Sequence, residues 1–231
     1  KGHVYGIEKD TGRVVWDTKL KHAVSAGVGL GDGLVLVGTS KGELIALAKA
    51  TGKLQWNINL TSEILSRPAV DLGVVVAQTV DGKVFALSAS DGAQLWMQER
   101  SEPALSLRGT SAPLAVGGIV LAGFASGKLA AFQLKDGRML WEIPIAEQRG
   151  RSEIERLVDV DVQPLVVGKL MYAAAYQGKL VAFNLENGRI LWSRDMSTYS
   201  GMDADSASIY VTDEKGAVSA LDMNTGATVW K

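Results

Sequence analysis

The residues of this sequence best suited to chemistry begin with a pair of carboxylates. Asp159 and Asp161 alternate with valines, and because successive side chains of a strand point to opposite faces, both carboxylates are expected on one side. Such a pair could bind a cation or perform acid–base chemistry, which needs two carboxylates in different environments. No histidine stands near them, since His3 and His22 lie far away in the chain. A partner-facing surface, an ion pair with Arg108 and a plain solvated strand stay open as alternatives.

A second segment combines apolar and cationic side chains. Leu105 and Leu107 stand two residues apart, and Arg108 follows them. Exposed leucines beside an arginine are typical of protein interfaces. The alternative is that both leucines are strand residues that face the core. The candidate partner-binding residues are therefore Leu105, Leu107, Arg108, Asp159 and Asp161.

Three weaker signals stand elsewhere. Ser152 and Glu155 have the spacing of a capping box, which predicts one helical turn. Asp203 and Asp205 resemble the start of a calcium loop, but the position of the central glycine is a serine, so we interpret them as a turn. The glycine-rich run 27–31 is not followed by a helical pattern, which argues against dinucleotide binding. We assign no catalytic, cofactor-binding or metal-binding residue.

A repeat in the chain must position these segments. Each tryptophan lies four residues after a glycine, which we call the turn glycine, and ten residues after a glycine or alanine. A further glycine, the leading glycine, precedes each turn glycine by ten residues. The tryptophans are Trp16, Trp56, Trp96, Trp141, Trp192 and Trp230, and the turn glycines are Gly12, Gly52, Gly92, Gly137, Gly188 and Gly226. A pattern of this regularity identifies a repeat array.

The repeat unit consists of short strands. Residues 42–47 form an apolar run, residues 49–52 have turn chemistry, and residues 53–57 alternate again, which together predict a β-hairpin. Two further strand candidates precede each hairpin, as at 67–70 and 74–79. The tryptophan spacings of 40, 40, 45, 51 and 38 residues fit a four-stranded propeller blade. We predict an all-β propeller of antiparallel blades, a single domain over 1–231, with about five complete blades and a leading hairpin.

The two candidate interface segments are insertions in this repeat. The longer intervals place extra residues in 97–112 and 142–163. Both would connect the outermost strand of one blade to the innermost strand of the next, so both are expected on one rim. Insertions of this kind map to loops, often on a binding face. A composite binding patch is therefore predicted.

The six tryptophans themselves have a structural interpretation. A large ring needs a slot, and the glycine or alanine ten positions earlier is expected to provide it on a neighbouring strand or blade. Burial of one tryptophan removes roughly 150 to 250 Å² from water, a gross gain of about 4 to 6 kcal/mol. A ligand platform is the alternative.

Composition limits the classes of function. The net charge is −1 and no cysteine is present, so the sequence offers no general electrostatic case for nucleic acid or an anionic membrane, and no disulfide or thiolate metal site. The longest apolar run, residues 114–125, has twelve residues with three glycines and is too short to span a bilayer. The sequence shows no signal peptide, and we expect a partial propeller.

The repeats resemble the pyrroloquinoline-quinone-type propeller family, which includes quinoprotein dehydrogenases and a non-enzymatic branch. Segments 103–113, 152–164 and 63–68 are similar to those of the propeller lipoproteins of the outer-membrane β-barrel assembly (BAM) machinery. The resemblance runs over essentially the whole chain.

This resemblance implies an eight-bladed scaffold without enzymatic activity or cofactor, on the periplasmic face of the bacterial outer membrane. It implies that Leu105, Leu107, Arg108, Asp159 and Asp161 contact a periplasmic POTRA domain of the barrel-inserting subunit BamA. Other BAM subunits would be met indirectly, and unfolded outer-membrane proteins are a further candidate partner. The lipid anchor of that family is absent from this chain. A quinone-dependent dehydrogenase and a generic periplasmic adaptor are the alternative functions.

Overall fold

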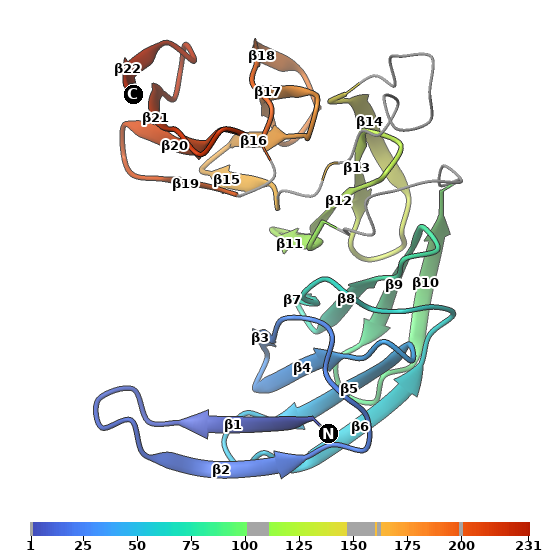
Figure 1. The fold of residues 1–231 in the computed structure, drawn as a ribbon. Coiled ribbons are helices and arrows are strands. Elements are labelled where there is room, and N and C mark those ends of the chain that lie inside the picture. Colours follow the sequence, from blue (N-terminus) through green and yellow to red (C-terminus); the bar gives the residue numbers. More distant parts are fainter. Residues whose placement is uncertain (1, 101–110, 147–159, 161–162, 199–200) are drawn as a thin grey trace. The chain divides into compact units, whose positions relative to one another are not determined.

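The computed structural model describes residues 2–100, 111–146, 160, 163–198 and 201–231 (Figure 1). Over these residues the secondary structure consists of strands and turns, and no helix is present. No segment among them is therefore a helix that could cross a membrane. The sequence prediction of an all-β chain is confirmed.

The strands form one two-stranded and five four-stranded sheets, and in each sheet the strands follow chain order (Figure 1). The first three sheets contain β1 (His3–Ile7) and β2 (Val14–Lys19); β3 (Gly29–Gly31), β4 (Leu34–Gly38), β5 (Glu43–Ala48) and β6 (Leu54–Asn59); β7 (Ala69–Asp71), β8 (Val74–Gln78), β9 (Lys83–Ser88) and β10 (Gln94–Glu99). The other three contain β11 (Leu114–Val116), β12 (Ile119–Gly123), β13 (Lys128–Gln133) and β14 (Met139–Pro144); β15 (Leu165–Val167), β16 (Leu170–Ala174), β17 (Lys179–Asn184) and β18 (Ile190–Asp195); β19 (Met202–Ala204), β20 (Ser208–Thr212), β21 (Val218–Asp222) and β22 (Thr228–Trp230). Neighbouring strands in a sheet are antiparallel.

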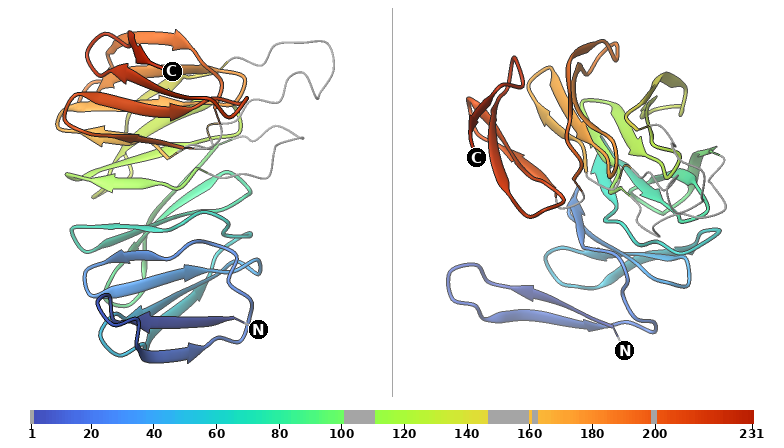
Figure 2. Two further views of the ribbon diagram at one scale, coloured as in Figure 1. Left: turned by 60° about the vertical axis from the view of Figure 1, so that its left-hand side comes forward. Right: turned by 45° about the horizontal axis from the view of Figure 1, so that its top comes forward.

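The chain divides into two compact units. Unit 1 comprises Lys1–Arg100, Ala115–Val120 and Gln133–Gly137, and unit 2 comprises Ser101–Leu114, Leu121–Phe132 and Arg138–Lys231. Within unit 2, the β15–β18 and β19–β22 sheets pack face to face (Figure 2) around Tyr172, Ile209 and Leu221. The prediction of one domain over 1–231 stays a prediction.

Burial differs between strands of one sheet for a simple reason. The third strand packs on both faces, so the middle of β5 is a continuous buried run from Leu44 to Leu47. The outer strand β6 packs on one face only and alternates, with Trp56 buried between exposed neighbours. The hairpin between them turns at Gly52, whose φ of +68° suits a residue without a side chain.

Each tryptophan except Trp230 lies between two small residues. Within its own sheet it faces the small residue ten positions earlier, as in the cross-strand pair of Ala46 and Trp56. Across to the next sheet it covers the turn glycine, so that a Cβ on Gly92 would lie 2.8 Å from the Trp56 ring. The slot expected from the sequence is therefore only half of the arrangement, because the turn glycine of the next repeat forms the other half.

One hydrogen bond repeats with this packing. The indole Nε1 donates to the backbone carbonyl three residues before the turn glycine that the ring covers. The five bonds are Trp16 to Lys49 at 3.0 Å, Trp56 to Ala89 at 2.9 Å, Trp96 to Leu134 at 2.7 Å, Trp141 to Leu185 at 3.2 Å and Trp192 to Met223 at 2.9 Å. A buried donor that is satisfied in this way fixes the angle of the ring as well as its depth. Trp230 is 49% exposed and packs at a tilt on Tyr210.

Candidate partner-binding site

The five candidate interface residues lie outside the described residues. These are Leu105, Leu107, Arg108, Asp159 and Asp161. The predicted capping box of Ser152 and Glu155 lies outside them as well. What the structure describes is where the two connections that carry these residues begin and end, namely after β10 and before β11, and after β14 and before β15.

Both connections begin at a repeated backbone contact. The residue that follows the outer strand donates its N–H to the carbonyl of the leading glycine in the same sheet. Arg100 donates to Gly82 at 3.0 Å where the first connection begins, and Ile145 donates to Gly127 at 2.9 Å where the second begins. The same contact is made at Leu20 and at Leu60, where the connections are short. Each long connection therefore starts from a position that the repeat fixes, next to the turn of its leading glycine.

A buried apolar residue anchors the second connection near its end. Val160 is fully buried and packs on Gly123 at the end of β12, where a Cβ would lie 2.6 Å from the Val160 carbonyl oxygen and 2.8 Å from its side chain. Ile64 packs on Gly38 in the same manner, four residues before Pro68, as Val160 stands four before Pro164. The Val-Asp alternation of the sequence did not distinguish Val160 as an anchor, but the shared spacing to proline could have done so.

Charged residues gather beside the leading glycines. Asp81 accepts hydrogen bonds from Thr61 at 2.8 Å and from Lys83 at 2.8 Å, and a third from Thr79. Burial alone would raise the pKa of Asp81, but these bonds outweigh it and lower the pKa below its ordinary value. The Asp81 carboxylate is therefore held in its charged form between the β3–β6 and β7–β10 sheets.

The position after the leading glycine, which is Lys83 in β9, is Glu43 in β5 and has the opposite sign. Glu43 Oε2 lies 2.8 Å from His22 Nδ1, and Asn57 donates to Oε1 at 3.1 Å. The hydrogen bond from His22 lowers the pKa of Glu43, and the bond from Asn57 acts in the same direction against the effect of burial. The position after the leading glycine thus accommodates an acidic or a basic side chain when a hydrogen-bonding partner is near.

The remaining candidates from the sequence are turn and strand residues. Asp205 accepts from the backbone N–H groups of Ala207 and Ser208, both at 2.8 Å, and so caps the turn between β19 and β20. The last three residues of the glycine-rich run 27–31 form β3. Among the described residues, no three histidine or acidic side chains come together in a way that could hold a metal ion.

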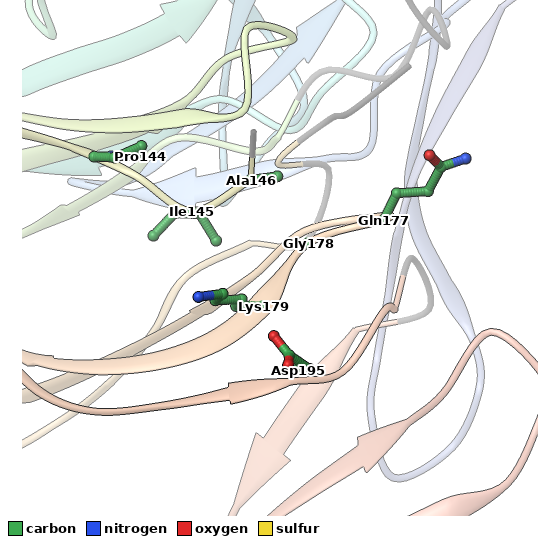
Figure 3. Close-up of a pocket in the computed structure, with 7 residues that line it drawn as sticks. All are labelled: Pro144, Ile145, Ala146, Gln177, Gly178, Lys179 and Asp195. Atoms are coloured by element: carbon green, nitrogen blue, oxygen red, sulfur yellow. The ribbon is translucent and has the colours of Figure 1, made fainter. Parts of the chain in front are cut away.

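A recess opens where the second connection begins (Figure 3). It is lined by Pro144, Ile145, Ala146, Gln177, Gly178, Lys179 and Asp195 and has a volume of about 170 Å³. Pockets for cofactors and small-molecule substrates are larger, roughly 300 to 1,000 Å³. A single side chain is a better match for this recess.

Comparison with known proteins places the chain in a family. The sequence profile described as "Outer membrane protein assembly factor BamB" matches residues 1–231. The chain belongs to the BamB family. A BamB of Pseudomonas aeruginosa is 49% identical over 230 residues, which is 100% of this chain and 60% of that protein. A BamB of Kangiella koreensis is 49% identical over 229 residues, which is 99% of this chain and 59% of that protein.

The chain therefore spans about 60% of the length of these BamB relatives. Among solved structures, BamB from Moraxella catarrhalis matches with a TM-score of 0.92 and 30% identity, over 99% of this chain and 70% of that one. The prediction of a β-propeller with four-stranded blades and a repeated tryptophan is confirmed. Quinohemoprotein alcohol dehydrogenase from Comamonas testosteroni matches with a TM-score of 0.74 at 17% identity, over 90% of this chain and 42% of that one, and this likeness concerns the fold alone.

Proposed function

We propose that this chain acts as a non-enzymatic scaffold in the assembly of outer-membrane β-barrel proteins, on the periplasmic side of the outer membrane. The observation that carries the proposal is the match of the BamB family over all 231 residues, together with 49% identity to BamB of Pseudomonas aeruginosa. The repeated indole contacts support it physically, because within each unit they tie one sheet to the next, and loops on packed sheets often carry binding functions.

The proposed partner is the periplasmic POTRA region of BamA. Leu105 and Leu107 would supply apolar anchors, and Arg108 a charge-assisted contact oriented by Asp159 or Asp161. Support for a docking role comes from the fixed starting points of both connections and from the buried anchor at Val160. Attachment to the membrane would be through a lipid anchor of the full-length protein.

The test is a binding isotherm against purified periplasmic domains of BamA. Arg108→Ala is expected to weaken binding by about 2 to 4 kcal/mol, the range of an interface hot spot. The matched control is Arg189→Ala, because Arg189 is an exposed arginine in the turn between β17 and β18 and belongs to neither connection in the sequence. Near-UV tryptophan signals check that both variants fold. Full-strength binding by a folded Arg108→Ala protein would refute the assignment of Arg108.

A further inference from the structure

The recess at the start of the second connection belongs to a position that recurs in the repeat. Lys179 follows its leading glycine, Gly178, as Lys83 follows Gly82. The cross-strand neighbours also correspond, since Lys83 pairs in register with Glu99 and Lys179 with Asp195. The two lysines therefore occupy the same place on their sheets, and their surroundings can be compared residue by residue.

The carboxylate of Asp81 is held next to Lys83. The Nζ of Lys83 donates to Asp81 at 2.8 Å, and the hydroxyls of Thr61 and Thr79 hold the same carboxylate from two further directions. Glu99 stands nearby as a second negative charge and helps to raise the pKa of Lys83, after the larger effect of the bond to Asp81. Lys83 therefore binds the carboxylate of Asp81 even though a second acidic residue, Glu99, stands on the neighbouring strand.

Around Lys179 all three of these groups are replaced. Gln177 stands where the β7–β10 sheet has Asp81, and Ala175 and Ala146 stand in place of the two threonines. The lysine and its acidic neighbour Asp195 are kept, but the carboxylate and both hydroxyls that hold it are gone. Figure 3 shows Lys179 and Asp195 on the wall of the resulting recess, with Ile145 and Ala146 across from them.

Other ionisable residues at this position have an ionisable partner. Glu43 meets His22 at 2.8 Å, and Lys128 donates to Glu142 at 2.8 Å. Across the part of the chain that the structure describes, Lys179 makes no ion pair and no side-chain hydrogen bond. It is a solvent-exposed ammonium beside an apolar wall, next to the point where residues 147–159 begin.

We propose that this recess receives an acidic side chain of the protein partner, whose carboxylate binds Lys179 in place of the missing Asp81 equivalent. The size of the recess, about 170 Å³, suits one such side chain, since a cavity of about 150 Å³ holds a benzene molecule. Ile145 and Ala146 would contact its methylene carbons. The inference rests on the proposed function, because it specifies the chemistry of the partner at the same end of the sheet.

The test compares wild type with Lys179→Gln, Lys179→Glu and Lys179→Arg in the BamA binding isotherm. Loss of one charge-assisted contact is expected to weaken binding roughly tenfold for Lys179→Gln, and further for Lys179→Glu, where the charges repel. Lys179→Arg keeps the charge and is expected to retain most of the binding. The control is Lys53→Gln, which removes an exposed lysine in the turn between β5 and β6. If wild type binds and Lys179→Gln binds equally, the inference is wrong and the proposed function stands; if wild type does not bind, the proposed function itself fails.

A cysteine introduced in the recess shows whether the side chain that fills it comes from the partner or from this chain. Because the chain has no cysteine, Gln177→Cys introduces a single reactive group at the wall of the recess. We expect maleimide to label it readily in the free protein and slowly in the complex, whereas Lys53→Cys reacts equally in both. Slow labelling in the free protein that becomes fast after Glu147→Gln would show that the chain fills the recess itself, and would overturn the proposal.

Discussion

Replacement of one turn glycine by alanine measures how much the packing of a tryptophan stabilises the fold. Gly92 has a φ of +77°, and a Cβ there would lie 2.8 and 3.0 Å from the Trp56 ring. Gly12 has nearly the same backbone conformation, with a φ of +70°, but nothing lies within 4 Å of its Cβ position. Both glycines belong to unit 1, so they report on the same structure. The pair separates backbone strain from steric contact.

The expected magnitudes follow from these distances. A left-handed backbone costs an alanine about 1 to 2 kcal/mol at either site. At Gly92 the new methyl group also displaces the ring of Trp56, a residue that is only 7% exposed, which adds about 1 to 3 kcal/mol for overpacking. Displacement of the ring weakens the bond from Trp56 Nε1 to Ala89, which is worth about 1 kcal/mol. Gly92→Ala should therefore lower the free energy of unfolding by about 2 to 4 kcal/mol more than Gly12→Ala.

The assay is urea unfolding, followed by tryptophan fluorescence and near-UV circular dichroism. With a slope of about 2 kcal/mol per molar urea, the Gly92→Ala midpoint should lie about 1 to 2 M below that of Gly12→Ala. Equal midpoints for the two variants would refute the reasoning, because they would mean that the glycine is required only for its φ and not for the contact with the indole.

Two further predictions concern residues beside a leading glycine and at the end of the second connection. Because the folded-state pKa of Asp81 lies below its unfolded value, its contribution to stability is present above about pH 4 and is lost as the pH falls through the folded-state pKa. Asp81→Asn should therefore be less stable than wild type at pH 7 by about 1 kcal/mol. In unfolding curves measured at decreasing pH, the difference in stability between the two proteins should disappear. A difference that does not change with pH would contradict this prediction. Gly123→Ala places a methyl group against Val160 and should lower the free energy of unfolding by about 1 to 3 kcal/mol. The same change should weaken binding to BamA. Unchanged binding would show that the Val160 anchor does not matter for docking.

Much of the fold could be predicted from the sequence, because the repeat consists of glycines, alanines and tryptophans at fixed spacings, and few other folds explain such a pattern. The pairing of Trp56 with Ala46 follows from a spacing that recurs six times, and the hairpin follows from the turn at Gly52. The contact between Trp56 and Gly92 did not follow. A positive φ already explains a glycine in a turn, so its second role as the surface under the preceding indole leaves no separate signal in the sequence.

The candidate site was accessible only in part. Leu105, Arg108 and Asp161 were selected by chemistry and by their place in insertions, and their assignment stays a prediction because they lie outside the described residues. The recess at Lys179 was not predicted, because a lysine after a glycine indicates no binding site until the residues around it are known. Alignment of the repeats on their leading glycines could have found it, since Gln177 then stands where another repeat has Asp81.

The measurement that tests the account most directly is amide hydrogen exchange of the chain, alone and bound to the periplasmic domains of BamA. Exchange reports local opening residue by residue, so it covers both connections at once. We predict that protection on binding is concentrated in residues 101–110 and 147–162 and around Gly178, at the ends of the sheets where the leading glycines lie. Protection concentrated instead at the turn glycines, such as Gly52 and Gly92, with residues 101–110 and 147–162 unchanged, would contradict the account.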